Sequence, residues 1–223
     1  MDTPLGRNER LVLIDTCGET AGIALSMGQQ VLASEDLARG SASAEIVQAI
    51  RRLLTQLDWR LRDLNAIGVV RGPGSFTGIR AGLAAAKGLC EATGLPLAAV
   101  SRLEVLADAA SLPDGFAVLD AGRGEVYVRD GSTGREWLCA GADLAAAFHG
   151  QRLAITEIRL SDQLGVGDTI FRPLHAADAL GPVQRRLREG GSNVALTDAN
   201  YVREEADIYR KPADGSKPAG AAT

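Results

Sequence analysis

Short apolar runs and two amphipathic segments dominate the first hundred residues. Three strands of an antiparallel meander are predicted by the apolar runs at 11–14, 21–25 and 31–37. Apolar residues recur at helical spacing over 46–57, as in a helix with one buried face. The pattern then predicts a strand over 66–70, a helix over about 77–93 and a strand over 97–100. This order is that of a ribonuclease-H-like lobe, in which a hairpin sheet is extended by parallel strands and covered by helices.

The pattern becomes less regular after Pro113. It predicts a hairpin from 116–121 and 125–129, a short helix over 143–149, a strand over 152–156 and a helix over 176–189. We therefore expect an α/β protein of two lobes, with the ribonuclease-H-like lobe over 1–103 and a smaller lobe over 104–200. Residues 201–210 are expected to return to the main body, with Tyr201 as an anchor. Residues 211–223 contain no core-forming residues and are expected to be disordered.

Composition narrows the classes of function. The 223 residues carry 24 Lys and Arg against 28 Asp and Glu, and this net charge of −4 argues against a protein that holds nucleic acid alone. Cys17, Cys90 and Cys139 are too widely spaced for a disulfide framework or a CxxC metal site, which favours the reducing cytoplasm. His149 and His175 are too far apart for an HExxH zinc site. No apolar run approaches the length of a membrane span, so no membrane contact is expected.

A glycine-rich loop, Gly72-Pro73-Gly74-Ser75-Phe76-Thr77-Gly78, joins a predicted strand to a predicted helix. Backbone amides at a helix N-terminus attract anions, so Gly72, Gly74 and Ser75 are candidate nucleotide or anion contacts. Asp15 is a fourth candidate, because it ends a buried strand just before a turn. The loop is neither a P-loop nor a dinucleotide fingerprint. A purely structural role for the loop, and a turn-capping role for Asp15, are the alternatives.

The helix predicted over 77–93 has two nonpolar faces of different size. At about 100° per residue, its bulky residues form one stripe, made of Ile79, Leu83, Ala86 and Cys90. The opposite side is lined by small residues that let a second helix approach closely: Ala81, Ala84, Ala85, Gly88 and Ala92. We predict that this small face contacts a partner protein, together with Ile46, Ile50 and Leu54 of the helix beside it. The alternative is that the helix over 46–57 itself covers the small face.

Three stretches closely resemble the bacterial TsaB (YeaZ) family: LVLIDTCGETAGIAL, AIGVVRGPGSFTGIRAGLAAAKGLCEATGLPLAAVSRLEVLA and DAGRGEVYV. The match covers somewhat more than half of the chain and is densest from Leu11 to Ala107. The resemblance implies a two-lobed fold of the actin/sugar-kinase/Hsp70 type with a reduced second lobe. It also implies a non-catalytic subunit that binds and supports TsaD. TsaD transfers the threonylcarbamoyl group from threonylcarbamoyl-AMP to the adenosine beside the anticodon of tRNAs.

The family resemblance implies further partners. A TsaE-like ATPase joins the complex, the chain forms a homodimer when alone, and tRNA is reached only through the complex. No resident cofactor or metal is implied, although a weakly bound nucleotide at the partner interface is left open. TsaD holds its metal with paired histidines on its first-lobe helix, and 46–57 contains no histidine here. The His-Ser-Glu run that often precedes this helix in the family is replaced by Ser41-Ala42-Ser43-Ala44-Glu45.

The alternatives belong to other classes of protein. An ATP-dependent small-molecule kinase of the same superfamily would need a complete phosphate turn and a catalytic Asp at the second-lobe interface. A metallopeptidase would need paired metal ligands. A purely structural homodimer would use the same small helix face. No stretch of the chain brings together a nucleophile, an oriented base and an oxyanion donor, so no catalytic residue and no metal ligand is predicted.

Overall fold

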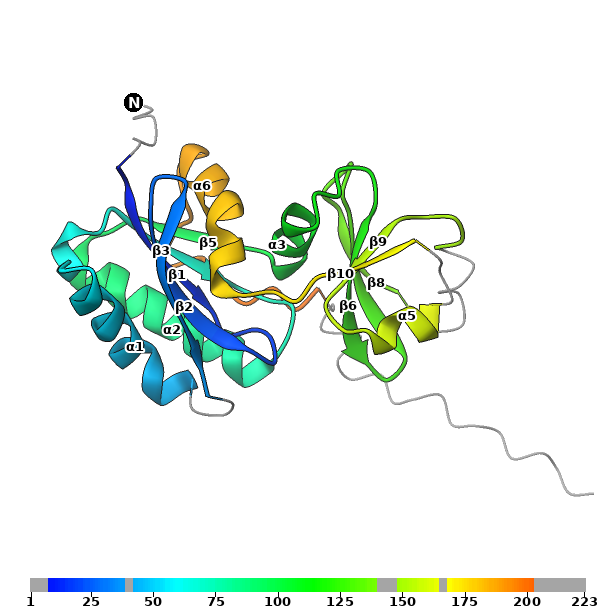
Figure 1. The fold of residues 1–223 in the computed structure, drawn as a ribbon, viewed down its shortest axis with the longest axis horizontal. Helices are drawn as coiled ribbons and strands as arrows, with labels where there is room; N and C mark the ends of the chain where they lie inside the picture. Colours follow the sequence, from blue (N-terminus) through cyan, green and yellow to red (C-terminus); the bar gives the residue numbers. More distant parts are fainter. Residues whose placement is uncertain (1–7, 39–41, 140–147, 165–167, 203–223) are drawn as a thin grey trace, which may run out of the picture.

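Two lobes lie side by side in the computed structural model, which describes residues 8–38, 42–139, 148–164 and 168–202 (Figure 1). Each lobe is built around a five-stranded sheet. The chain forms the first lobe, crosses to the second, and then returns to pack a last helix against the first sheet. The predicted α/β class with two lobes is confirmed.

The first sheet has the strand order β3-β2-β1-β4-β5. Its strands are β1 (Arg10–Asp15), β2 (Ala21–Met27), β3 (Gln30–Leu37), β4 (Ala66–Val70) and β5 (Leu97–Val100). β1 is antiparallel to β2 and parallel to β4, so Val12 lies opposite both Leu25 and Ile67. Almost every residue of β1 and β4 is buried, which explains why their sequences are continuous apolar runs and do not alternate.

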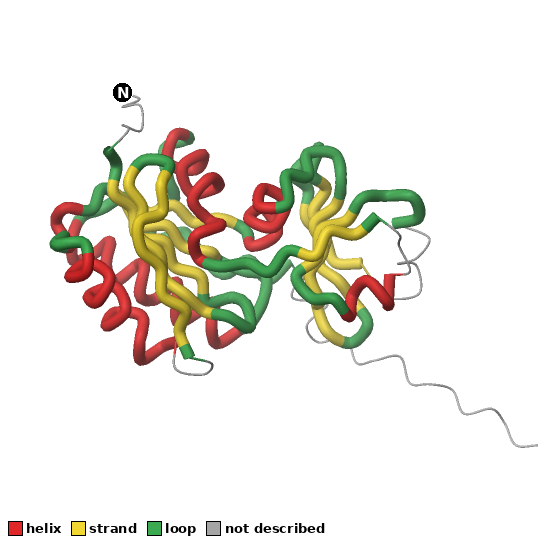
Figure 2. The backbone as a smooth tube through the Cα atoms, viewed as in Figure 1, coloured by secondary structure: helices red, strands yellow, loops and turns green. Residues whose placement is uncertain are grey.

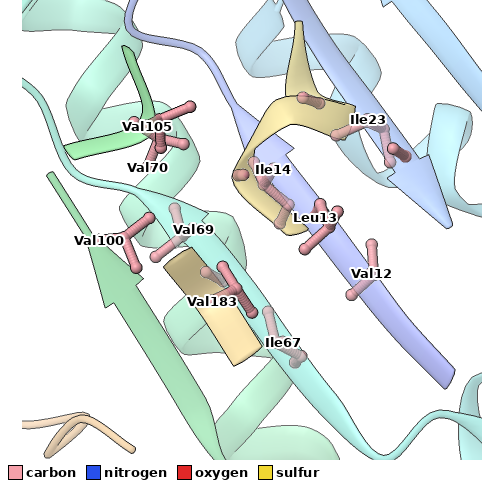
Figure 3. Close-up of a cluster of buried hydrophobic side chains, with 14 of the residues drawn as sticks. Val12, Leu13, Ile14, Ile23, Ile67, Val69, Val70, Val100, Val105 and Val183 are labelled. Carbon is pink, nitrogen blue, oxygen red and sulfur yellow. The ribbon is translucent and has the colours of Figure 1, made fainter. Parts of the chain in front are cut away.

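Helices cover both faces of this sheet (Figure 2). On one face lie α1 (Ala42–Gln56) and α2 (Phe76–Thr93), and on the other lie the short η3 (Ala176–Ala179) and α6 (Leu180–Arg188). Figure 3 shows Val183 of α6 among the side chains of β1 and β4, including Leu13 and Ile67. A short 3-10 turn, η1 (Leu61–Asp63), precedes β4. The first lobe is therefore a three-layer arrangement with its core on both sides of the sheet.

The second sheet has the strand order β10-β9-β6-β7-β8. The elements of this part are α3 (Arg102–Ala109), β6 (Phe116–Gly122), β7 (Glu125–Asp130), β8 (Glu136–Cys139), β9 (Leu153–Ile155), α5 (Arg159–Leu164) and β10 (Thr169–Phe171). The larger cluster of buried apolar residues, here called the main core, contains the strands of the first sheet. Along β6, Ala117 and Leu119 belong to this main core, whereas Val118 belongs to a separate cluster around Phe148. The alternation puts one face of this sheet against α3 and the other against α5 and Phe148.

The strands and helices predicted for the first hundred residues are confirmed, with most bounds within one or two residues and α1 starting four residues earlier. The short β8, α5 and β10 were not predicted, because segments of three to six residues carry little periodicity. The helix predicted over 143–149 falls almost entirely outside the described residues, as do 203–210 and the tail 211–223. None of the helices in the described segments has both the length and the apolar character needed to cross a membrane.

The division between the lobes differs from the predicted one. The second sheet ends with β10, and η3 and α6 already pack on strands of the first sheet. Leu180 and Val183 of α6 are buried against that sheet. The smaller lobe therefore spans about 116–171, not 104–200, because the amphipathic α6 supplies the layer that the second face of the first sheet requires.

Candidate functional site

The glycine-rich loop holds the end of β1 against the start of α2. A Cβ atom at Gly74 would overlap the carbonyl oxygen of Cys17, and one at Gly78 would overlap that of Thr16. The Ser75 amide donates a hydrogen bond to the Cys17 carbonyl at 2.8 Å, and the Thr16 hydroxyl donates to the Gly78 carbonyl at 2.6 Å. Glycine is required at both positions because two backbone segments touch there. The loop therefore has a structural role, one of the alternatives that the sequence left open: it packs the segment after β1 against the start of α2.

Asp15 and Gly72, the first residue of the loop, are both buried. Asp15 is 2% exposed, and its carboxylate accepts a hydrogen bond from the Cys17 amide at 2.9 Å, which is the turn-capping arrangement. Burial raises the pKa of Asp15, opposed by the positive charge of Arg102 and by the hydrogen bond from Cys17. Gly72 is buried beside Ile79 and the backbone of Asn200.

A cleft of about 490 Å³ separates the two lobes at the mouth of this loop. Gly74 and Ser75 line it, but Asp15 and Gly72 are not among its lining residues. Its charged lining comes from both lobes: Glu19, Arg102, Asp120, Glu157 and Arg159. The three carboxylates oppose a phosphate, while the helix N-terminus and the arginines attract one. Nucleotide or anion binding by Gly74 and Ser75 remains a prediction.

The arginines of the cleft differ in their partners. Arg159 forms ion pairs with Asp120 at 2.9 Å and with Glu157 at 2.5 Å, all three within the second lobe. The Nε atom of Arg102 is buried without a hydrogen-bond partner, and its guanidinium lies against Gly18. Sequence reasoning missed this second wall, because Asp120 and Arg159 are 39 positions apart and meet only through the fold. Among the described residues, no group of three or more His, Cys, Asp or Glu side chains is placed to hold a metal ion.

The small face of α2 is open to solvent along its centre. Ala84, Gly88 and Ala92 are exposed, whereas Ala81 and Ala85 are half-buried against the main core. A Cβ atom at Gly88 would meet nothing within 4 Å. The bulky stripe on the other side of the helix is buried as predicted, with Ile79, Leu83, Ala86 and Cys90 all in the core. The middle of the small face is therefore available to another helix or another protein.

The α1 residues assigned to the same surface are not available. Ile46, Ile50 and Leu54 are 1%, 3% and 6% exposed, because they hold α1 against β2 and β3. Their assignment as partner contacts is therefore corrected: the apolar stripe of α1 is used by the chain's own sheet. On the outer side of α1, Val47 is 50% exposed.

An aromatic and cationic group at the start of α2 was not predicted. Phe76 is 54% exposed and stacks on Tyr201, with ring centroids 5.7 Å apart. The Arg80 guanidinium lies 3.8 Å from the centre of the Phe76 ring, and its Nε donates a hydrogen bond to the Tyr201 hydroxyl at 3.3 Å. Tyr201 thus anchors the returning chain, as its sequence position predicted, and it does so on α2.

Comparisons with known sequences agree on one family. The model of the family described as TsaD, tRNA N6-adenosine threonylcarbamoyltransferase, matches residues 35–148, just over half of the chain. Two relatives named tRNA threonylcarbamoyladenosine biosynthesis protein TsaB are 37% identical over 122 residues in Escherichia coli and 38% identical over 120 residues in Bacillus subtilis. The alignments cover 53% and 52% of this chain and the same shares of those proteins. The chain thus spans about half the length of the curated relatives it matches.

Comparison with solved structures extends the likeness to both lobes. YeaZ from Pseudomonas aeruginosa superimposes with a TM-score of 0.72 at 26% sequence identity. The superposition covers 86% of this chain and 99% of that protein. The fold is therefore shared well beyond the part of the chain in which the sequences align most closely.

Proposed function

The chain belongs to the family described as TsaD, tRNA N6-adenosine threonylcarbamoyltransferase, and within it to the TsaB (YeaZ) group. On that premise we propose that it is a non-catalytic subunit in forming N6-threonylcarbamoyladenosine on tRNA. It binds and supports a TsaD-like subunit, which transfers the threonylcarbamoyl group from threonylcarbamoyl-AMP to the adenosine beside the anticodon. The names of the TsaB relatives support the pathway.

The surface of α2 is the observation that carries this proposal. Ala84 and Gly88 present a strip without side chains beyond a methyl group, and nothing in the described chain covers Gly88. Such a strip lets the backbone of a second helix approach until the two nearly touch. Its exposure supports a docking role, and an isolated chain would use the same strip for a homodimer. Partner and homodimer therefore compete for one surface.

The position of Asp15 supports a non-catalytic role. In kinases of this superfamily, an acidic residue at the end of this strand faces the metal of the nucleotide. Here the carboxyl is buried, its pKa is raised by burial, and it caps its own turn through the Cys17 amide. A TsaE-like ATPase joins the assembly, tRNA is reached through the complex, and the work takes place in the cytoplasm. These finer assignments rest on the family and complete the proposal.

The direct test places a charge on the strip. Ala84→Arg should leave folding unchanged, because Ala84 is exposed, and weaken binding to the organism's TsaD-like subunit by about 100-fold or more, because an arginine would be buried unpaired. Gln151→Arg, an exposed site on the second lobe, is the matched control. Binding is measured by isothermal titration calorimetry and folding by circular dichroism. Unchanged affinity of a folded Ala84→Arg variant would refute the docking surface.

A further inference from the structure

The returning chain reaches across the junction of the two lobes. After α6, residues 192–202, here called the C-terminal strap, run back along the first lobe (Figure 1). The strap is fixed to the edge of the first sheet: the Ser192 amide donates to the Leu97 carbonyl at 2.7 Å, and the Ser192 hydroxyl accepts from the Ala99 amide at 3.0 Å. Its far end lies beside α2, where Tyr201 stacks on Phe76.

Asn200 is the residue of the strap that contacts both lobes. Its backbone amide donates to the Arg71 carbonyl at 2.7 Å, just after β4 in the first lobe. Its side-chain Nδ2 donates to Oε2 of Glu136 at 2.8 Å, on β8 of the second lobe. The same Nδ2 lies 3.5 Å from the hydroxyl of Ser101, the N-cap of α3 between the lobes. The backbone and side-chain amides of this one residue thus join the end of β4, the start of α3 and the edge of the second sheet.

Glu136 is held in place to receive this contact. Its other carboxylate oxygen accepts a hydrogen bond from Nη1 of Arg129 at 2.9 Å, and the two side chains are 15% and 21% exposed. Arg129 also donates to the Gly134 carbonyl at 3.0 Å, so the pair is fixed within the second lobe. A hydrogen bond to a charged, half-buried carboxylate is stronger than one between neutral groups in water. The Asn200–Glu136 bond is therefore suited to hold one lobe to the other.

We infer that Asn200 is a latch that fixes the orientation of the second lobe and transmits it, through its neighbour Tyr201, to the start of α2. The connection to α2 is short: Tyr201 follows Asn200 directly, stacks on Phe76 and accepts a hydrogen bond from Arg80. The latch is a property of this chain alone, so it holds whether or not the proposed partner binds. On the proposed function, it would make the docking helix sensitive to rotation of the second lobe.

The first experiment measures the distance between the lobes. Spin labels are placed at two exposed positions, Arg51→Cys on α1 and Gln151→Cys on the second lobe, in a Cys139→Ser background. Cys17 and Cys90 are buried and are left in place. Asn200→Ala should broaden the distribution of inter-label distances measured by pulsed electron paramagnetic resonance. Glu136→Ala should do the same from the other side of the bond, and the double variant should add nothing further.

The matched control is Asn193→Ala, the same substitution on the same strap. The Asn193 side chain accepts from the Leu196 amide at 3.1 Å, a bond that stays within the strap. This variant should keep the wild-type distance distribution. A distribution for Asn200→Ala that superimposes on the wild type, or an equal broadening in Asn193→Ala, would overturn the latch. Glu136→Ala leaves the strap itself unaltered, so it tests the proposal even where Asn200→Ala impairs folding.

The second experiment tests transmission to α2. Hydrogen exchange is followed in peptides covering 76–84 of the Glu136→Ala variant, whose altered residue lies in the other lobe. Loss of one charge-assisted bond should accelerate exchange there by about tenfold if the strap carries the change to the helix. Asn193→Ala should leave these peptides unchanged. Broadened inter-lobe distances with unaltered exchange in 76–84 would contradict transmission through Tyr201.

Discussion

The two sheets are equal in strand number but not in how they are covered. The first sheet is enclosed by α1 and α2 on one face and by η3 and α6 on the other. The second sheet shares one face with the main core, and its other face is covered by a separate cluster around Phe148. One face of the second sheet thus packs in the same core as the first sheet. The proposed docking strip lies on the better supported lobe, where a rigid helix can present it.

The largest expected effect comes from breaking the contact that positions α2. Gly78→Val would drive a side chain into the Thr16 carbonyl, which is backbone and cannot move aside. We expect a loss of about 4 kcal/mol or more in the free energy of unfolding, or no soluble folded protein. Urea titration followed by circular dichroism measures it. Stability close to that of the wild type would show that the end of β1 is not clamped to α2.

A core deletion in the second lobe should have a smaller and local effect. Phe148→Ala removes a ring that is 2% exposed and lies 5.6 Å from the Phe116 ring. We expect a loss of about 3 kcal/mol, concentrated in β6, β7 and β9, with slow hydrogen exchange preserved in β1 and β4. Leu13→Ala, in the first sheet, is the comparison and should accelerate exchange in both lobes. Equal, uniform acceleration in both variants would mean that the lobes unfold as a single unit.

Two carboxyl groups, one in each lobe, should respond to pH with opposite sign. Burial raises the pKa of Asp15 above 3.8. The free-energy cost of burying the charged carboxylate in the folded state therefore grows as pH rises through the raised pKa. Asp15→Asn should therefore gain stability relative to the wild type as pH rises. The pKa of Asp130 is lowered by hydrogen bonds from Ser132 and then Thr133. The stability that the charged Asp130 carboxylate gives the folded state is present above pH 3.8 and is lost as pH falls through the lowered pKa.

The measurement for this pair is thermal unfolding of each variant and the wild type between pH 3 and 8. Asp130→Asn should lose stability relative to the wild type as pH rises, the reverse of Asp15→Asn. Because Asp130 is more accessible to solvent than the buried Asp15, its effect should be the weaker of the two. The same sign of pH dependence in both variants would contradict the assigned cause of one shift.

The smallest change separates folding from docking. Gly88→Ala replaces a helical glycine at a place where a Cβ meets nothing, so it should stabilise the chain by about 0.5–1 kcal/mol. The added methyl should nevertheless weaken binding of the TsaD-like subunit, because it fills the space that a close backbone approach requires. Calorimetry of unfolding and of binding gives both numbers. Tighter or equal binding would mean that the partner does not approach at Gly88.

The sequence predicted local elements far better than long-range contacts. The strand over 66–70, the glycine-rich loop and the buried stripe of α2 follow from periodicity and turn chemistry, and all are found. The stripe of α1 was also found, but periodicity shows only that Ile46 and Ile50 share a face. It does not show that the chain's own sheet occupies this face. Only the packing of the whole fold shows that the sheet, and not a partner, contacts this stripe.

The contacts between residues far apart in the sequence could not be predicted for a different reason. Asn200 meets Glu136, 64 positions away, and Asp120 meets Arg159, 39 positions away. Neither pair follows a local spacing rule: the first depends on where the second lobe lies against the first, and the second on how β6 and α5 meet within the second lobe. The return of α6 to the first sheet has the same origin. Its amphipathic pattern predicted a helix, but the choice of sheet is a property of the whole fold.

The most direct test of the docking surface is hydroxyl-radical footprinting of the chain with and without the TsaD-like subunit. Four exposed apolar side chains serve as reporters: Val47 and Phe76 on the first lobe, and Ile158 and Phe171 on the second. If α2 is the docking helix, the subunit protects Phe76, and Val47 on the neighbouring α1, while Ile158 and Phe171 keep their reactivity. Protection of Ile158 and Phe171 with Phe76 unchanged would place the partner on the other lobe and contradict the proposal.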